Sequence, residues 1–596
     1  MCNRLRLIFS FFPRATYSIG SGLRQVNLLV LTSELTVTMS RARFFSQGEV
    51  MSVRNGFVLL LTLSALVFLG ACGGSNNGVA TPVAPPSGSF SNSSLNGTYV
   101  FAVSGIESSG GAYSIAGTLT ANGNGGITGG TFDLNDPAEL TSGPIAEASI
   151  NSGSTYSITV DGRGQTQINT NIQNLPAINF DFVLSSTSSG QVTEADSYGT
   201  GTGTLDAQTA SVTPSGSYAF SLSGTVGSGT LATAGNFALG SNGVINSGLE
   251  DFNDDGVAAY PAESLTGNVV VSSSAPSTTL NSSSYPNLIF DVFPISASHL
   301  KFIEMDAIAT LLGDAYSQTS TTIPTGTLPF TLLGTVSAGV PFAAGGMFIT
   351  DGNGNITSSS SEDFNQGGSL SPSGSSIISG TYTAGGTGRY TFGLTTFTGG
   401  ATYAAYPSTG GVLLLDIDSG AGVVTTGAAY GPQSSSATLA TGEGFGFSLA
   451  GFNLAEEAEI FDTGEFATSS SGSTLSSGVI DEGFYDSNSG LGSTYGVPLT
   501  AGSFTAPSGG RGQITATATS SNGNNSTLNG GLDLLYYVVD GTTFPFIEYD
   551  SGQVAAGIFV LQNTGSSSGS IAKPHDMFLP HVSLHPGVKA NAKKIN

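Results

Sequence analysis

The chain has 596 residues, enough for several domains, yet only 9% of them are charged and its formal net charge is −25. A field this acidic repels nucleic acid and anionic lipid headgroups, so the composition argues against nucleic-acid binding. Two cysteines, four histidines and no tryptophan leave few candidates for disulfides, multi-histidine zinc sites or Ser-His-Asp triads.

The N-terminal region is typical of a targeting signal. Residues 1–50 carry scattered arginines without a hydrophobic period, and Met51 starts a sequence with a basic residue followed by an apolar run. The run is about 15 residues long, whereas a membrane-spanning helix needs about 20. We therefore interpret 1–50 as a leader from too early an annotated start, and 51–71 as a signal peptide.

The sequence Leu69-Gly-Ala-Cys72 closes the apolar run. It resembles the lipobox of bacterial lipoproteins, in which the cysteine becomes a lipidated N-terminus. The resemblance covers residues 51–73 and implies acyl chains, such as palmitate, that hold Cys72 in the lipid bilayer. Gly73 differs from the Asp that retains such proteins in the inner membrane, which favours the outer membrane. Residues 72–90, rich in Gly, Ser and Pro, are predicted to be a flexible tether.

Four copies of one unit follow the tether, at residues 91–210, 211–320, 321–440 and 441–563. Each copy opens with a short aromatic strand, and most continue with an Asn-Gly or Asp-Gly turn of the kind that tight hairpins need. A unit of about 115 residues is long enough to bury its own core. We therefore predict four self-sufficient domains arranged like beads.

Each copy contains several short strand-like runs and no long helical pattern. The sequence thus predicts an all-β fold of antiparallel units, most simply an up-and-down β-barrel, which leaves no exposed edge strand. A β-sandwich is the alternative, since strand order cannot be deduced from one chain. The units resemble tandem β-repeat modules, without an assigned activity, of predicted lipoproteins from environmental bacteria.

Two acidic residues, two positions apart, recur near the end of each copy: Glu194/Asp196, Glu304/Asp306, Asp416/Asp418 and Glu548/Asp550. Paired carboxylates hydrolyse glycosides in some enzymes. Here the fourfold recurrence, with no surrounding motif, favours a structural role, in which these residues satisfy turn amides or a buried partner. No catalytic residue is predicted.

Each repeat contains one lysine or arginine, and the three arginines each follow a glycine. We predict that each arginine pairs with the first acid of its own unit, to give Arg163–Glu194, Arg389–Asp416 and Arg511–Glu548. Lys301, three residues before Glu304, is expected to act differently.

The segment Asp251-Phe-Asn-Asp-Asp-Gly256 is similar to the first half of a calcium-binding loop, although the acid expected at the twelfth position is absent. It predicts either a weak Ca²⁺ site formed by Asp251, Asn253 and Asp255 or an Asx-type turn without metal. No other cofactor is expected.

Residues 564–596 form a basic, proline-interrupted tail that we predict to be disordered and to dock on the acidic body or on an anionic cell-surface polymer. Taken together, the sequence predicts a membrane-anchored, non-enzymatic, extracytoplasmic lipoprotein that acts in surface structure, adhesion or binding of an extracellular ligand. One alternative is a carrier of small apolar ligands, with cavities lined by residues such as Phe101, Phe220, Phe330 and Phe447. A carbohydrate-active enzyme is the other.

Overall fold

The computed structural model describes residues 89–564, except for 174, 210–211, 228, 256–257, 272–276, 308, 338, 372–375, 397–398, 421, 435–437 and 519–530. All described residues belong to one compact unit. Cys72, the leader, the signal peptide, most of the tether and nearly all of the tail lie outside the described residues.

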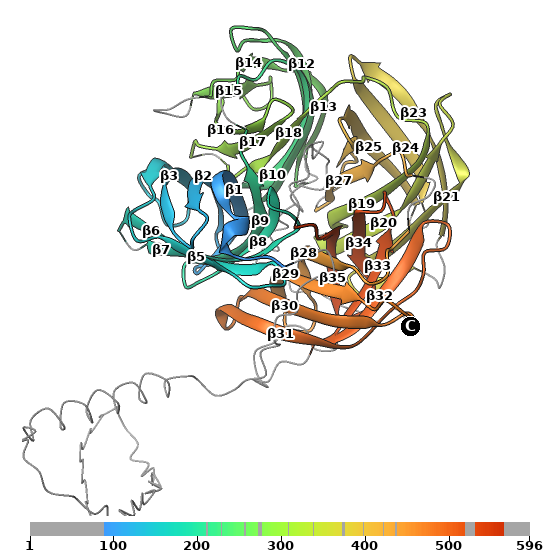
Figure 1. The fold of residues 1–596 in the computed structure, drawn as a ribbon. Coiled ribbons are helices and arrows are strands. Elements are labelled where there is room, and N and C mark those ends of the chain that lie inside the picture. The colour runs from blue at the N-terminus through green and yellow to red at the C-terminus, as the bar shows by residue number, and fades with distance from the viewer. Residues whose placement is uncertain are drawn as a thin grey trace, which may run out of the picture. The chain divides into compact units, whose positions relative to one another are not determined.

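Four antiparallel sheets make up the described chain, and each lies within one of the four repeats (Figure 1). In repeat 1 a short 3-10 helix (Asn92–Ser94) precedes nine strands in the order β4-β3-β2-β1-β9-β8-β7-β6-β5. Their bounds are β1 Asn96–Glu107, β2 Ala112–Asn122, β3 Ile127–Asn135, β4 Ile145–Ser149, β5 Thr155–Ile158, β6 Arg163–Ile172, β7 Leu175–Leu184, β8 Ser189–Ala195 and β9 Gly199–Ala207.

Repeat 2 has the same strand order, β13-β12-β11-β10-β18-β17-β16-β15-β14. Its strands are β10 Gly216–Val226, β11 Gly229–Leu239, β12 Ile245–Asp254, β13 Ala258–Ser264, β14 Thr266–Asn268, β15 Thr278–Asn281, β16 Leu288–Ser296, β17 His299–Glu304 and β18 Leu312–Ser317. In both repeats a single bridge, Gly126 with Thr155 and Val244 with Asn268, brings the two ends of the sheet together.

Repeats 3 and 4 complete the series. Repeat 3 contains β19 Gly326–Val336, β20 Val340–Thr350, β21 Asn355–Gln366, β22 Ser369–Leu370, β23 Ser376–Gly386, β24 Arg389–Thr396, β25 Gly399–Ser408, β26 Gly411–Asp416 and β27 Val424–Tyr430. Repeat 4 is a closed barrel of β28 Gly444–Asn453, β29 Ala458–Thr468, β30 Leu475–Asp486, β31 Gly490–Phe504, β32 Arg511–Ala518, β33 Leu532–Tyr537, β34 Thr543–Glu548 and β35 Gln553–Leu561. The predicted all-β, barrel-like fold is confirmed.

Side chains alternate along each strand, and one set fills the inside of the barrel. In β1 the residues Tyr99, Phe101 and Val103 belong to the core cluster of repeat 1, and each of the other repeats has a cluster of its own. Phe330 stacks on Phe348 with ring centroids 4.0 Å apart, which shows how aromatic side chains fill the interior of repeat 3.

A glycine on the last strand of each barrel allows that strand to pair closely with the first. Gly203, for example, faces Val103, and a Cβ built on it would lie 1.7 Å from the carbonyl oxygen of Ala102. The equivalent glycines are Gly313, Gly427 and Gly557, whose added Cβ atoms would lie 2.0 to 2.2 Å from a β10, β19 or β28 carbonyl oxygen. Any larger residue at these positions would push the two strands apart.

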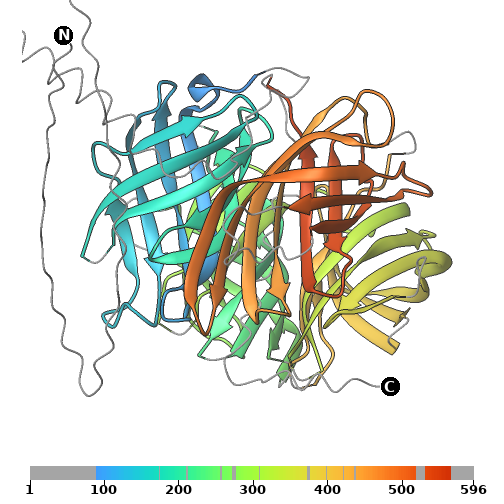
Figure 2. The same cartoon turned by 90° about the horizontal axis from the view of Figure 1, so that it is seen from below.

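The outward face of many strands is also buried, because each barrel packs against two others. Apolar clusters join repeat 1 to repeat 2, repeat 2 to repeat 3, and repeat 3 to repeat 4. Strands β28, β29 and β30 contact β7, β8 and β9, so repeat 4 packs on repeat 1 (Figure 2). The four contacts form a closed cycle, and the repeats are packed together rather than strung as beads.

The cycle also brings the two ends of the described chain together. The backbone N–H of Phe90 donates to Val160, and the side-chain amide of Gln562 donates to Asp161, in the same turn of repeat 1. A Cβ built on Gly162 would lie within 3 Å of both the Phe90 and the Gln562 side chains.

Candidate functional site

The chemistry-bearing residues that recur in every repeat meet at the contacts between repeats. The first of them is an aspartate on the third strand, in chain order, of each repeat: Asp133, Asp251, Asp363 and Asp481. In three repeats a backbone N–H from the next strand donates to this carboxylate, at 2.7 Å from Glu147, 2.8 Å from Ala262 and 2.7 Å from Gly496. Each of these donors has a positive φ, at a break in the strand register.

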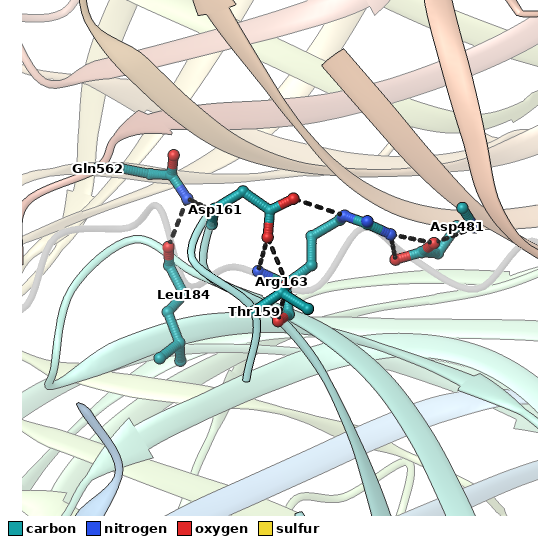
Figure 3. A network of polar contacts seen from close by, with 7 residues as sticks. Thr159, Asp161, Arg163, Leu184, Asp481 and Gln562 are labelled. Atoms are coloured by element: carbon teal, nitrogen blue, oxygen red, sulfur yellow. Dashed lines mark hydrogen bonds and ion pairs between the residues drawn. The ribbon is translucent and has the colours of Figure 1, made fainter. Parts of the chain in front are cut away.

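An arginine from the next repeat in the cycle binds three of these four aspartates. Arg389 Nε and Nη2 donate to the two oxygens of Asp251, each at 2.7 Å, and Arg511 binds Asp363 in the same bidentate manner at 2.7 and 3.0 Å. Arg163 Nη1 lies 3.0 Å from Asp481, and its Nε lies 3.3 Å from Asp161 of its own repeat (Figure 3). These are charge-assisted bonds between surfaces withdrawn from water.

Burial governs the electrostatics of these ion pairs. The Arg163 and Asp481 side chains are each 1% exposed, whereas Arg511 is 27% exposed. Burial raises the pKa of the Asp481 carboxyl to about 6, although Arg163 opposes the shift. Burial also disfavours the charged form of Arg389, but Asp251 outweighs it, so the pKa of Arg389 is raised. The guanidinium groups therefore stay charged between the repeats.

The predicted pairing of each arginine within its own unit is wrong. Glu194 Oε2 accepts the Tyr113 hydroxyl at 2.7 Å, Asp416 Oδ2 accepts the Thr425 hydroxyl at 3.1 Å, and Glu548 Oε1 accepts the Asp533 N–H at 2.7 Å. The arginines lie on the outward face of their strands and reach a neighbouring repeat. The carboxyls assigned to them are buried elsewhere, and burial raises their pKa values.

The acid pairs serve as backbone anchors, as the structural interpretation predicted. The second acid of a pair accepts a backbone N–H from the neighbouring strand, at 2.8 Å for Asp196 from Asn179 and for Asp418 from Thr402. Its own N–H binds the first acid, at 2.7 Å from Asp306 to Glu304 and at 2.8 Å from Asp418 to Asp416.

An asparagine two residues after the recurring aspartate reaches the turn that carries the next repeat's acid pair. The Asn135 amide donates to the Glu304 and Ala309 carbonyl oxygens, each at 2.8 Å. Asn253 donates to the carbonyl oxygens of Asp416 and Val423, each at 2.9 Å. Asn365 donates to the carbonyls of Glu548, Asp550 and Gln553. Gly483 takes this place in repeat 4, beside the Glu194 carbonyl of repeat 1.

A glutamine at the end of each repeat makes a second contact of the same kind. Its amide donates to a carbonyl of the next repeat in the cycle, at 2.8 Å from Gln208 to Pro294 and at 2.6 Å from Gln433 to Val538. Gln318 donates to Pro407, and Gln562 donates to Leu184, which closes the cycle from repeat 4 to repeat 1 (Figure 3).

Lys301 differs from the arginines, as expected. Its Nζ lies 2.7 Å from Asp314 of its own repeat, and His299 Nε2 lies 2.7 Å from the same carboxylate oxygen. The three side chains are at most 3% exposed.

The predicted calcium site is wrong, because the side chains of Asp251 and Asn253 are already committed. Both oxygens of Asp251 bind Arg389, and Asp251 also accepts the Tyr406 hydroxyl. Asn253 turns its amide toward repeat 3, and the Asp255 carbonyl accepts the Gly422 N–H. Among the described residues, no group of three His, Cys, Asp or Glu side chains is placed to hold a metal ion.

The aromatic residues named for a ligand cavity are core residues. Phe101, Phe220, Phe330 and Phe447 are each no more than 1% exposed and pack inside the four barrel clusters. Phe447 packs on Phe466 with centroids 6.1 Å apart, and Phe101 on Phe180 at 5.7 Å. This packing argues against the carrier alternative.

The asparagine contacts were missed by the sequence reasoning. Their signal in the sequence is the pattern shared by Asp133-Leu-Asn135, Asp251-Phe-Asn253 and Asp363-Phe-Asn365, but this pattern does not say that the asparagine contacts another repeat. The described residues contain no helix that is long and apolar enough to span a membrane.

Comparisons with known proteins leave the family open. No protein-family model matches the sequence, and no curated relative matches it. Among solved structures, the chain is similar to a double mutant of the vaccine antigen transferrin binding protein B from Haemophilus parasuis Hp5. That match has 8% identity and a TM-score of 0.18, and covers 82% of this chain and 98% of that one. A single mutant of the same antigen matches with 9% identity, a TM-score of 0.18 and the same coverage. Scores this low carry no argument about function.

Proposed function

We propose that the protein is an extracytoplasmic lipoprotein, anchored through Cys72, whose body is a rigid, non-enzymatic scaffold for surface structure, adhesion or ligand binding at the outer membrane. One observation carries the scaffold part. The arginine, asparagine and glutamine side chains that recur in the repeats reach from one repeat to the next. Their recurrence is thus explained by assembly of the body, without recourse to catalysis.

The acid pairs support the same proposal. A glycosidase needs two carboxyls that face a substrate, one of them free to act on water or on the sugar. Glu304 is fully buried, and Asn135 of repeat 1 donates to its Oε2 at 2.8 Å. The carboxylates of Asp306 and Asp418 hold backbone amides. These groups fix the turns on which the neighbouring repeat rests.

The anchor is tested by metabolic labelling of the full chain with a palmitate analogue in a bacterial host. We expect label in the wild type and none after Cys72→Ser, while Cys2→Ser, in the upstream leader, keeps the label. Label that persists in Cys72→Ser would exclude this cysteine as the anchor.

The location is tested on the same cells. Protease added to intact cells, and to cells with a permeabilised outer membrane, distinguishes an outward-facing body from one that faces the periplasm. Recovery of the wild-type protein in the outer-membrane fraction, and its loss with Cys72→Ser, is the expected result. Recovery in the inner-membrane fraction would contradict the proposal.

A further inference from the structure

The contact between repeats 1 and 2 departs from the other three at the recurring aspartate. Asp133 is held by the Glu147 N–H, as Asp251 and Asp481 are held by theirs, but no arginine of the described residues binds it. Its Oδ2 is buried, and no N–H or hydroxyl of the described residues donates to it. The side chain that faces it is a second carboxyl, Asp291 of β16 in repeat 2.

The composition of repeat 2 explains why the arginine is missing. Residues 211–320 contain one lysine and no arginine. That lysine, Lys301, lies with its Nζ 2.7 Å from Asp314 of the same repeat. Repeat 2 therefore has no arginine to offer Asp133.

We propose that Asp133 and Asp291 bind one proton between them, and that this proton replaces the guanidinium group that joins the other repeats. Asp133 is 1% exposed and Asp291 is 4% exposed, so neither carboxyl is well solvated. Two such groups within hydrogen-bonding reach do not both ionise. With one proton taken from solvent, an O–H of one carboxyl donates to the other carboxylate, a short and strong type of bond. When the proton leaves, two negative charges face each other across the contact.

The surrounding charges favour retention of this proton. The negative charge of Glu147, in β4, raises the pKa of Asp133, whereas the hydrogen bond from the Glu147 backbone N–H lowers it. On the repeat 2 side, Lys301 and Asp314 bind each other at 2.7 Å, and the Asn135 amide donates to the Glu304 carboxyl. Burial is the largest cause that raises the pKa of Asp133, to about 8, and the Asp291 carboxyl and the Glu147 charge raise it further.

The raised pKa of Asp133 determines how the stability of the contact depends on pH. The folded contact holds its proton well above the pH at which a free aspartate loses it. The stability of the contact is therefore complete in acid, and it is lost as the pH rises toward and through about 8. At the arginine contacts the cation is a guanidinium, which keeps its charge throughout this range.

Hydrogen–deuterium exchange of the full chain, read by mass spectrometry, tests the proposal. Exchange in β3 and β16, corrected for the intrinsic pH dependence, is compared with exchange in β21 and β33 of the repeat 3–repeat 4 contact. From about pH 5 to about pH 8 we expect exchange in β3 and β16 to accelerate by up to about tenfold per pH unit, because the opened contact releases the proton that the closed contact holds, and we expect the acceleration to level off above about pH 8. We expect β21 and β33 to accelerate less. Equal pH dependence at the two contacts would overturn the proposal.

Two variants separate the proton from other causes. Asp291→Asn keeps a donor for the Asp133 carboxylate and removes the shared titration, so the selective acceleration should disappear. Asp181→Asn, the matched control at the same position in repeat 1, lies near Arg163 and Asp481 and should leave β3 and β16 unchanged. Persistence of the effect in Asp291→Asn would refute the shared proton. Protection of β3 and β16 that depends on added Ca²⁺, or is lost with a chelator at about pH 6, would assign the position to a metal ion instead.

Discussion

The repeat 2–repeat 3 contact and the repeat 1–repeat 2 contact use the same amide groups but different charged groups. In both, an asparagine and a glutamine bind backbone carbonyls of the next repeat. The first contact adds the Arg389–Asp251 ion pair, whereas the second places Asp291 beside Asp133. Neutral amides thus specify how neighbouring repeats meet, and the charged position determines how each contact responds to pH.

The largest expected effect is a decrease in the free energy of unfolding as the pH rises. It tests whether buried acids make the stability of repeats 2 and 3 depend on pH even though an arginine joins them. Burial raises the pKa of Glu250 to about 8 and that of Asp416 to about 7, and these residues lie in repeats 2 and 3. The folded state therefore binds more protons than the unfolded state between about pH 4 and about pH 8, and each such group lowers the free energy of unfolding by up to about 1.4 kcal/mol per pH unit there. Urea unfolding across this range should show a steady decrease; a maximum near pH 8 would contradict it.

Arg389→Met should give the next largest effect, because it converts the repeat 2–repeat 3 contact into one that lacks its cation. Removing one partner of a buried pair typically costs about 3–5 kcal/mol, since the other charge stays buried without compensation. Arg511→Met is the matched comparison and should cost less, because that side chain is 27% exposed. Equal losses of unfolding free energy in the two variants would mean that burial does not set the strength of these pairs.

Asn253→Ala removes the neutral part of the same contact. It leaves the carbonyls of Asp416 and Val423 without their donor, and a loss of about 1–3 kcal/mol is expected from unsatisfied buried groups. The exposed Asn355, which bonds within its own turn, is the control, and its replacement by alanine should change stability by less than about 0.5 kcal/mol. Unlike the effect of Arg389→Met, the loss in Asn253→Ala should not depend on pH.

The smallest effects concern the residues that donate a backbone N–H to the recurring aspartates. Gly496 has φ +74°, so Gly496→Ala should destabilise repeat 4 by about 1 kcal/mol. Glu147 has φ +51°, and Glu147→Gly should relieve that strain and remove a negative charge beside Asp133. Thermal unfolding of both variants measures the difference; destabilisation by Glu147→Gly would show that its side chain is needed at the contact.

The sequence was sufficient to predict the repeats and their barrel-like folds, because turn residues and aromatic strands are local signals. It was insufficient for the partners of Arg163, Arg389 and Arg511, since strand periodicity places a side chain on the outward face but does not say which repeat covers that face. The closing glycines, such as Gly203, were missed for a similar reason. Close strand approach depends on pairing between the first and last strands of a barrel, which are about 100 residues apart.

The proximity of Phe90 and Gln562 has a consequence for chain connectivity. Both ends of the body meet at the turn around Gly162, and each repeat contacts its successor through the same kinds of groups. A short linker between these ends, with new termini opened between repeats 1 and 2, would give a circular permutant with every contact preserved. The order of the repeats along the chain could then be changed by circular permutation without changing the folded body.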